Sequence, residues 1–349
     1  MQDSSTGIMN FTPKELGFSM PPESARHECC WMAWPTNRSL WGDHIQAGRV
    51  AYAATANTIV KHEPVYMIVR PDDESEARKL LDSAVSVLAF PLQDGWMRDI
   101  GPTFVVNSEN HALAGIDWGF NGWGTHFRPY DENAAIAREV LSVAPRKPER
   151  FVGRMILEGG SIHIDGDGTL VATEECLLNG DRNPHLTKAE IEQNLYDFLG
   201  VEKVIWLPYG LVDDLTDGHV DNVACFAAPG VAIALVAEES DKNYPRLQAN
   251  LDILRSATDA KGRSLEVHEI QIPEKQLYFQ NLRLPMSYVN FYLANNSVIL
   301  PVFDDVNDDN AKQSIQNIFP NRTVETVPGT DITYGGGCVH CITQQQPAP

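Results

Sequence analysis

A recurring order of predicted elements is the feature that most constrains how this chain can fold. A short apolar strand leads into a turn rich in glycine, aspartate or histidine, a hairpin-like pair of strands comes next, and an amphipathic helix follows. This order recurs about five times along the 349 residues. Repetition of one supersecondary unit is typical of folds in which neighbouring units cover each other's apolar faces. The chain is therefore predicted to be an α/β protein whose repeated units close into a ring.

Alternating and helical apolar patterns locate the elements of these units. The predicted strands lie at residues 85–92, 103–107, 155–157, 161–173 (a hairpin), 204–207, 223–226, 231–236, 265–272, 289–293, 297–302 and 323–327. The predicted helices lie near residues 132–143, 188–199, 244–258 and 310–318. Thr187 and Glu190 form a capping box at the start of the second of these helices, and Gly200 ends it.

The turns that carry reactive side chains follow the same interval as the units. Asp99 and Glu158 are 59 residues apart, Glu158 and His219 are 61 apart, and Asp221 lies 120 residues before Cys341. Equal spacing predicts that the turns lie at the same end of successive units and face one central cavity. The residues after Cys341 are expected to pair with the N-terminal segment and close the ring. A doubly wound α/β sheet is the alternative, but its helices usually follow each strand without an intervening hairpin.

The charge of the chain restricts its partners. Forty-seven acidic and 27 basic side chains give a formal charge of −20, which repels nucleic-acid phosphates and anionic lipids and attracts cations. A small cationic molecule is therefore the expected partner, with neither nucleic acid nor membrane involved. An excess of acidic side chains that serves solubility alone is the alternative interpretation.

The ends of the chain and its apolar segments indicate a cytoplasmic protein. The first twenty residues lack the regions of a secretory signal, and the longest apolar run, near residues 231–237, is shorter than the roughly 20 residues that cross a bilayer. Six cysteines are too few for a disulfide scaffold in a chain of this length. No linker divides the sequence, so residues 1–349 are predicted to form one catalytic domain with loosely ordered ends at about 1–12 and 344–349.

Cys341 is the candidate nucleophile. It follows a run of three glycines at residues 335–337, and such a run lets the backbone approach a planar substrate closely. A lone cysteine is more often a small buried apolar side chain. His219 and Asp221 lie in DGHVD, where a spacing of two puts both side chains on one face of an extended segment. A surface turn or a fragment of a metal site would have the same pattern.

Two further turns offer carboxylates. Asp99 closes DGWMRD, a turn that also contains Trp96, although a surface pair with Arg98 and a buried tryptophan explain that turn better in isolation. Glu158 stands between an apolar strand end and two glycines, where a plain turn residue is the alternative. Taken together, one thiol, one imidazole and three carboxylates match the requirements of a single hydrolytic reaction.

Seven segments in fixed order carry a resemblance to a known family. They are WMAWP (31–35), DGWMRDIGPTF (94–104), DWGFNGWG (117–124), LEGGSIHIDGDGT (157–169), TDGHVDN (216–222), LPMSYVNFY (284–292) and GGGCVHCITQQ (335–345). In these segments the chain resembles the agmatine deiminases of the guanidine-modifying superfamily. The resemblance implies a five-bladed pseudo-symmetric α/β propeller of repeated ββαβ units around a central active-site cavity. The chain departs from the family at Cys338, where asparagine is more common.

The resemblance also implies an activity and roles for the residues. The expected reaction converts agmatine and water to N-carbamoylputrescine and ammonia through a covalent thiouronium intermediate. Asp99 and Asp221 are expected to hold the guanidinium, Cys341 to attack it, and His219 with Glu158 to transfer protons. Further substrate contacts are expected from Trp96, Trp123, Gly336 and Gly337. No cofactor or metal is expected. The chain is expected to form a homodimer or a larger homo-oligomer.

Other functions stay open at this point. A deiminase of arginine or peptidyl-arginine would use the same five catalytic residues and differ in how it holds the rest of the substrate. A noncatalytic guanidine- or polyamine-binding protein would use the carboxylates and tryptophans but would not need Cys341. A calcium-binding turn at residues 164–168 is a third alternative, although an Asp/Gly turn between two strands explains that segment more simply.

Overall fold

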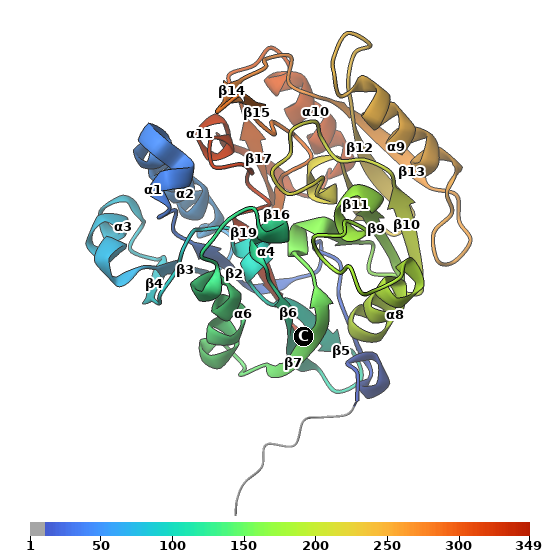
Figure 1. Ribbon diagram of the computed structural model, residues 1–349, viewed down its shortest axis with the longest axis horizontal. Coiled ribbons are helices and arrows are strands. Elements are labelled where there is room, and N and C mark those ends of the chain that lie inside the picture. The colour runs from blue at the N-terminus through green and yellow to red at the C-terminus, as the bar shows by residue number, and fades with distance from the viewer. Residues whose placement is uncertain (1–10) are drawn as a thin grey trace, which may run out of the picture.

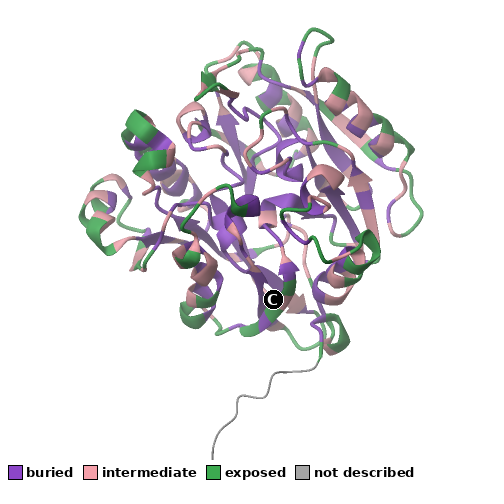
Figure 2. Ribbon diagram, in the orientation of Figure 1, coloured by how far each residue is buried: buried purple, intermediate pink, exposed green. Residues whose placement is uncertain are grey.

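A mixed α/β architecture organises the chain. The computed structural model describes residues 11–349, and in this part of the chain five sheets of three or four strands accompany one separate two-stranded pair. The longer helices lie at the rim of the molecule, while the short helix α4 (Met97–Ile100) lies near its middle (Figure 1). Burial follows the same division, because the inner strands are largely buried and the outward faces of the rim helices are exposed (Figure 2).

One pairing pattern recurs in all five sheets. Two strands pair antiparallel, a helix follows the second strand, and the next strand returns parallel to that second strand. In four sheets the antiparallel pair is formed by consecutive strands. These units are β5 (Thr103–Asn107), β6 (Ala112–Gly119), α6 (Asp131–Val143) and β7 (Glu149–Ile156); β8 (Ile162–Ile164), β9 (Thr169–Thr173), α8 (Lys188–Leu199) and β10 (Lys203–Leu207); β11 (Ala224–Ala228), β12 (Val231–Val236), α9 (Tyr244–Ser256) and β13 (Glu266–Gln271); and β16 (Tyr292–Ala294), β17 (Ser297–Val302), α10 (Asp308–Ile318) and β18 (Thr323–Pro328).

The fifth sheet joins the two ends of the described chain. Strand β19 (Thr343–Pro347) pairs antiparallel with β2 (His27–Ala33), helix α2 (Ile45–Ile59) follows, and β3 (Val65–Val69) returns parallel to β2. Strand β4 (Ser86–Ala89) extends this sheet beside β3. The expected pairing between the residues after Cys341 and the N-terminal segment is therefore confirmed.

Smaller elements complete the described chain. They are η1 (Lys14–Leu16), β1 (Phe18–Ser19), α1 (Arg38–Trp41), η2 (Gly42–His44), η3 (Pro71–Asp73), α3 (Glu74–Leu80), α5 (Gly122–Thr125), η4 (Gly159–Ser161), α7 (Glu174–Leu177), η5 (Val220–Asn222), β14 (Tyr278–Phe279), β15 (Leu282–Arg283) and α11 (Thr330–Thr333). No helix among residues 11–349 has the length and apolar character needed to cross a membrane.

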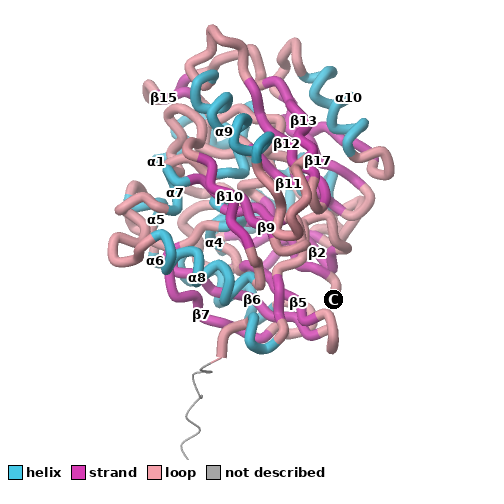
Figure 3. Tube along the Cα trace, turned by 90° about the vertical axis from the view of Figure 1, so that its right-hand side faces the viewer, coloured by secondary structure: helices cyan, strands magenta, loops and turns pink. Residues whose placement is uncertain are grey.

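Helix α8 illustrates how the sequence determines these elements. The Thr187 side chain accepts a hydrogen bond from the backbone N–H of Glu190, the Glu190 side chain caps the backbone of Thr187 in return, and Gly200 ends the helix at a φ of 71°. Its inward face carries Ile191, Leu195, Phe198 and Leu199, all of them buried. The predicted helix at 188–199 is confirmed at both ends. Seen from the side, α9 lies against strands β12 and β13 in the same manner (Figure 3).

The strands that return in parallel lead directly to the segments with reactive side chains. Strand β4 leads to α4, β7 to η4, β10 to the loop that ends in η5, and β18 to α11 and the glycine run. Strands β7, β10 and β18 hold the position of the returning strand in their sheets, and β4 lies one strand beyond β3. The segments that follow them contact one another, as α4 does with η4 and η4 with η5.

The predicted loose C-terminal end is wrong as far as residue 347. Gln344, Gln345 and Gln346 are buried in β19, although their polarity suggested an exposed tail. Gln346 Oε1 accepts a hydrogen bond from Trp31 Nε1 at 3.1 Å, and Gln346 Nε2 donates to the carbonyl of Pro145 at 3.0 Å. Internal partners of this kind remove the cost of burying an amide. Of the other predicted loose end, residues 1–10 lie outside the described chain.

The pairing of Gln346 with Trp31 leads to a stability prediction. Replacing Gln346 by alanine leaves the buried Trp31 N–H without its acceptor, so the free energy of unfolding should fall by about 2 kcal/mol. Chemical denaturation of the variant and of wild type measures this difference. Lys312→Ala, at an exposed position of α10, is the control and should change the value by less than about 0.5 kcal/mol. Equal denaturation midpoints for Gln346→Ala and wild type would contradict the structural role of this amide.

Candidate active site

The five candidate catalytic residues lie in the converging segments. Asp99 is in α4, Glu158 precedes η4, His219 precedes η5, Asp221 is in η5, and Cys341 is in the turn before β19. All are at least 94% buried. His219 Nδ1 lies 3.8 Å from Asp99 Oδ1, and His219 Nε2 lies 3.9 Å from Glu158 Oε2. Cys341 Sγ lies 3.5 Å from Asp221 Oδ2. The structure therefore brings together all five residues that the sequence singled out.

Gly160 keeps the space between these groups open. A Cβ atom at this position would lie 2.5 Å from His219 Nδ1, 2.9 Å from Asp221 Oδ2 and 3.0 Å from Asp99 Oδ1. These separations are too short for real atoms, so only a glycine fits. The second glycine of the EGG segment is thus required by the proximity of three functional side chains.

A pocket opens over Cys341. Its empty space of about 320 Å³ includes solvent at its mouth. Its lining consists of Leu40, Trp96, Asp99, Trp123, Phe127, Leu215, Thr216, Gly335, Gly336, Gly337 and Cys341. The two tryptophans and two glycines predicted to contact a substrate are therefore all in its wall.

The two tryptophans hold carboxylates as well as lining the pocket. Trp123 Nε1 donates a hydrogen bond to Asp99 Oδ2 at 2.9 Å, which fixes one oxygen of that carboxylate. Trp96 Nε1 donates to Asp94 Oδ2 at 2.7 Å, and its ring stacks on that of Trp41 with the ring centroids 5.7 Å apart. Both rings are consequently held in fixed orientations.

The glycine run lets the backbone lie against these groups. A Cβ atom on Gly337 would lie 2.7 Å from the ring of Trp96 and 3.0 Å from Cys341 Sγ. Gly336 has a φ of 103°, a conformation that other residues rarely adopt. The run therefore forms a thin wall beside the thiol.

Several buried polar atoms at this site have no hydrogen-bond partner within the described chain. They are Glu158 Oε2, Asp221 Oδ1 and both ring nitrogens of His219. Buried polar atoms are nearly always paired, so an unpaired group of four in one place indicates a site for a polar ligand. Two acceptor oxygens of this kind suit a ligand that donates several N–H bonds.

Burial and the neighbouring charges shift the protonation equilibria of the site. Burial raises the pKa of Asp99 to about 6, and His219 only partly opposes this. Burial would lower the pKa of His219, but Asp99, Cys176 and Glu158 together outweigh it and raise the pKa well above the usual value. Burial, followed by the charges of Asp221 and Asp99, raises the pKa of the Cys341 thiol well above its usual range. The free site thus pairs an uncharged thiol with an imidazolium.

Two residues of the site were missed by the sequence analysis. Arg182 is buried and donates from Nε to Glu158 Oε1 at 3.1 Å, so it neutralises that carboxylate. Asn290 Nδ2 donates to Cys341 Sγ at 3.4 Å. The 120-residue interval between Asp221 and Cys341, twice the usual spacing, was the available signal for an unassigned turn that contains Asn290. No pattern pointed to Arg182, which lies in an irregular loop.

Asn290 also corrects a predicted strand. The strand expected at 289–293 begins only at Tyr292, because the preceding residues turn toward the site. The backbone N–H of His340 donates both to the carbonyl and to Oδ1 of Asn290, at 3.1 and 2.9 Å. These bonds occupy groups that a longer β16 would use for strand pairing.

Cys338 and Cys341 are both free thiols in this structure. Burial raises the pKa of the Cys338 thiol to about 12, so few thiolates form there near neutral pH. Glu158 Oε1 already accepts a hydrogen bond from the positively charged Arg182, so this oxygen is unsuited to bind a metal cation. These observations favour acid–base and nucleophilic chemistry by the protein's own side chains.

Comparison with known proteins identifies the family. Residues 19–347 match the family described as Porphyromonas-type peptidyl-arginine deiminase. The chain belongs to this family. Within it, the chain is 44% identical over 361 residues to the agmatine deiminase of Pseudomonas aeruginosa strain LESB58, covering 97% of this chain and 98% of that protein. The resemblance to the agmatine deiminases is confirmed.

Solved structures of family members show the same fold. The agmatine deiminase of Enterococcus faecalis superposes with a TM-score of 0.94 at 35% identity and covers 99% of this chain and 100% of its own. A cysteine-to-serine variant of the C. jejuni agmatine deiminase, with substrate bound, superposes with a TM-score of 0.85 at 28% identity and covers 99% and 98% of the two chains.

The raised pKa of Cys341 leads to a prediction about its titration. A thiol with a raised pKa stays uncharged until the pH exceeds that pKa, and removing a negative neighbour should lower it. We expect Asp99→Asn to move the ionisation of Cys341 to lower pH. The ultraviolet absorbance of the thiolate, taken as the difference from a matching variant with Cys341→Ala, measures the titration.

Asp72→Asn is the control, because Asp72 is exposed and should leave the titration unchanged. A thiol pKa in Asp99→Asn equal to or higher than that of wild type would show that Asp99 does not repel the thiolate.

Proposed function

We propose that this protein is a hydrolase that converts agmatine and water to N-carbamoylputrescine and ammonia through a covalent intermediate on Cys341. The observation that carries the proposal is the buried grouping of a thiol, an imidazolium and three carboxylates, with two carboxylate oxygens left unpaired. The agmatine deiminase relatives support the substrate. The C. jejuni variant, which holds its substrate when a cysteine is replaced by serine, supports a reacting cysteine.

The carboxylates suit a guanidinium group. A guanidinium is planar, always charged and rich in N–H donors, and each hydrogen bond between charged groups contributes about 1.5–3 kcal/mol. Asp99 Oδ1 and Asp221 Oδ2 both border the space that Gly160 leaves open, and Asp221 Oδ1 has no hydrogen-bond partner among residues 11–349. A guanidinium held between them presents its central carbon to Cys341.

Substrate binding also explains how the thiol becomes reactive. In the free site, the negative charges of Asp221 and Asp99 oppose ionisation of Cys341. A bound cation offsets those charges, so the thiol pKa falls when the substrate arrives. The nucleophile therefore forms in the presence of its target.

The chemical steps follow from these positions. The Cys341 thiolate attacks the guanidinium carbon, and a C–S bond forms as the carbon becomes tetrahedral. The His219 imidazolium gives its proton to the departing nitrogen, the C–N bond breaks, ammonia leaves, and a positively charged S-alkylthiouronium remains. Neutral His219, held near Glu158, then takes a proton from water as its oxygen attacks the same carbon. The C–S bond breaks as the new hydroxyl group gives its proton to solvent, and the neutral ureido product leaves with thiolate and imidazolium restored.

A second cavity beside the pocket favours agmatine over arginine. It shares Leu40, Phe127, Leu215 and Gly336 with the reaction pocket. Asp213 lines it, and its one arginine, Arg283, is held by Asp241 through contacts of 2.6 and 2.7 Å. Asp213 accepts one backbone hydrogen bond, from the N–H of Arg283 at 3.2 Å, and has no cationic partner among the described residues. Such a carboxylate suits the terminal ammonium of agmatine, whereas the carboxylate of arginine would need an unengaged cation.

Architecture and assembly form part of the proposal. The fivefold recurrence of one pairing pattern supports a five-bladed α/β propeller in which residues 1–349 form a single catalytic domain. We further propose a cytoplasmic location and a homodimer or larger homo-oligomer, which cell fractionation and light scattering would test.

Ammonia release tests the reaction, the nucleophile and the substrate together. Wild type should release ammonia from agmatine and much less from arginine or an arginyl peptide, and Cys341→Ala should reduce release from agmatine by at least about 10⁴-fold. Preference for arginine or the peptide would keep the chemistry and replace the substrate. Absence of release from all three would favour a binding protein instead.

Gly160 provides a further test of the site geometry. A methyl group in Gly160→Ala would push apart His219, Asp99 and Asp221, so kcat/KM for agmatine should fall by about 100-fold or more. Gly180→Ala is the matched control, because a Cβ atom at Gly180 meets nothing within 4 Å. Steady-state kinetics of the two variants measure kcat/KM. Comparable values for Gly160→Ala and Gly180→Ala would mean that the reaction does not need the open space at Gly160.

A further inference from the structure

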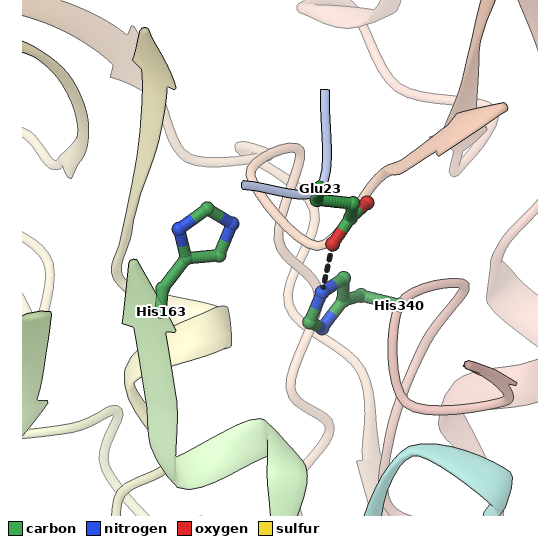
Figure 4. Close-up of side chains that lie close together, drawn as sticks. All are labelled: Glu23, His163 and His340. Atoms are coloured by element: carbon green, nitrogen blue, oxygen red, sulfur yellow. Dashed lines mark hydrogen bonds and ion pairs between the residues drawn. The ribbon is translucent and has the colours of Figure 1, made fainter. Parts of the chain in front are cut away.

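His340, the residue before Cys341, bridges two buried carboxylates. Its Nε2 lies 2.8 Å from Glu23 Oε2, and its Nδ1 lies 2.8 Å from Asp221 Oδ2. Figure 4 shows the first of these contacts, with Glu23 and His340 facing each other. All three side chains are at least 95% buried. A continuous chain of charged groups thus runs from Glu23 to Asp221, whose Oδ2 lies 3.5 Å from Cys341 Sγ.

The geometry determines the protonation state of this bridge. An ionised carboxylate only accepts hydrogen bonds, so a ring with a carboxylate at each nitrogen donates from both and is an imidazolium. The other charged group facing it is Arg98, whose Nη2 lies 3.5 Å from Glu23 Oε2. Burial and Arg98 lower the pKa of His340, but the two carboxylates outweigh them and raise it.

Glu23 is itself held firmly. The backbone N–H of Leu293 donates to Glu23 Oε1 at 2.8 Å, and His27 Nε2 lies 2.7 Å from the Glu23 carbonyl oxygen. Arg98 Nε donates to the backbone carbonyl of His340 at 3.3 Å and so holds the histidine side of this contact. The far end of the bridge is therefore anchored to several separate segments of the chain.

At the Asp221 end of the bridge, the two carboxylate oxygens have different surroundings. Oδ2 accepts the His340 bond and lies near Cys341 Sγ, while Oδ1 has no partner within the described chain. A carboxylate with one oxygen tied and one free has a fixed plane. Asp221 Oδ2 borders the space beside Gly160, and the same carboxylate leaves Oδ1 available to a ligand that enters there.

We propose that His340, anchored by Glu23, is a positioning residue. It keeps Asp221 ionised and orients the free oxygen of Asp221 toward the nitrogens of the bound guanidinium. This inference rests on the proposed deiminase function. Without the imidazolium, only the charges of His219 and Arg98 would oppose the effect of burial, which raises the pKa of Asp221, so the carboxylate would take up a proton more readily. The protonated carboxyl would lose its attraction for a cation.

A metal ion is a poorer explanation of this cluster. Glu23, His163 and His340 lie close enough for their side chains to share an ion. However, His163 Nδ1 accepts a hydrogen bond from the backbone N–H of Phe226 at 3.2 Å, so in a neutral ring Nε2 carries the hydrogen and offers no lone pair. Figure 4 draws no contact from His163 to the other two side chains, and Arg98 adds a positive charge.

Two substitutions at His340 separate orientation from mere packing. His340→Asn places an amide N–H near the position of Nδ1, where it can still donate to Asp221. His340→Gln places its amide near the position of Nε2, where it reaches Glu23 and leaves Asp221 without a donor. His163→Asn is the matched control, since it changes a buried histidine of the same cluster but keeps an acceptor for Phe226. Thermal unfolding establishes that each variant is folded.

The readout compares two reagents that alkylate Cys341 with loss of chloride. One is 2-chloroacetamidine, a planar cation, and the other is 2-chloroacetamide, its neutral counterpart. Their rate ratio reports the recognition of positive charge and cancels changes in thiol reactivity. We expect the ratio to fall by about tenfold or more in His340→Gln, to fall less in His340→Asn, which keeps the donor to Asp221 but loses the positive charge, and to stay within about threefold of wild type in His163→Asn. Equal ratios in the two His340 variants would overturn the proposal.

Two further measurements keep the test decisive. If His340→Gln does not fold, ¹⁵N resonances of labelled wild type, assigned with His340→Asn, report whether both ring nitrogens are protonated, and a neutral ring near neutral pH would overturn the proposal. Ammonia release from agmatine is measured on the same samples. A wild type with the expected reagent ratios but no ammonia release would refute the deiminase function and leave the positioning role standing.

Discussion

The burial of several carboxylates around one thiol is the constraint on which the rest of the structure depends. An unpaired charge in a protein interior is costly, so each carboxylate needs a cation beside it. Asp99 lies near His219, Glu158 near Arg182, and Asp221 near His340. These pairs leave the free pocket close to neutral while the thiol keeps its proton. A cation that enters upsets this balance, and loss of the thiol proton restores it.

The fold meets this constraint with segments that are distant in sequence. The backbone N–H of Arg98 donates to the carbonyl of Cys341 at 3.1 Å, and Asn290 binds the backbone of His340. Such bonds join the turns to one another as well as to their own sheets. Glycines 160 and 337 then allow these turns to approach more closely than any side chain would permit. The position of the thiol is consequently set by several sheets together.

Much of this organisation could be predicted from the sequence, because it is expressed in local patterns and in spacing. The capping box of α8 and the alternating strands predicted their elements, and the regular interval between turns predicted that Asp99, Glu158 and His219 would meet. Roles that arise only from packing had no such signal. Arg182 lies in an irregular loop, and Glu23 acquires its partners from segments far away in the chain. The buried glutamines of β19 were wrongly predicted to be exposed for the same reason. Their polarity can be seen in the sequence, but the partners that tertiary structure supplies cannot.

The pairing of β19 with β2 has a consequence for the synthesis of the protein. Residues 27–33 leave the ribosome early, and one edge of β2 then has no partner until residues 343–347 have also emerged. An unpaired strand edge is prone to join other chains, and contacts between residues so far apart form slowly. Cys341 is also the last of the site residues to be translated. A nascent chain therefore exposes an unpaired strand edge until residues 343–347 emerge, and Cys341 takes its place only when that edge is covered.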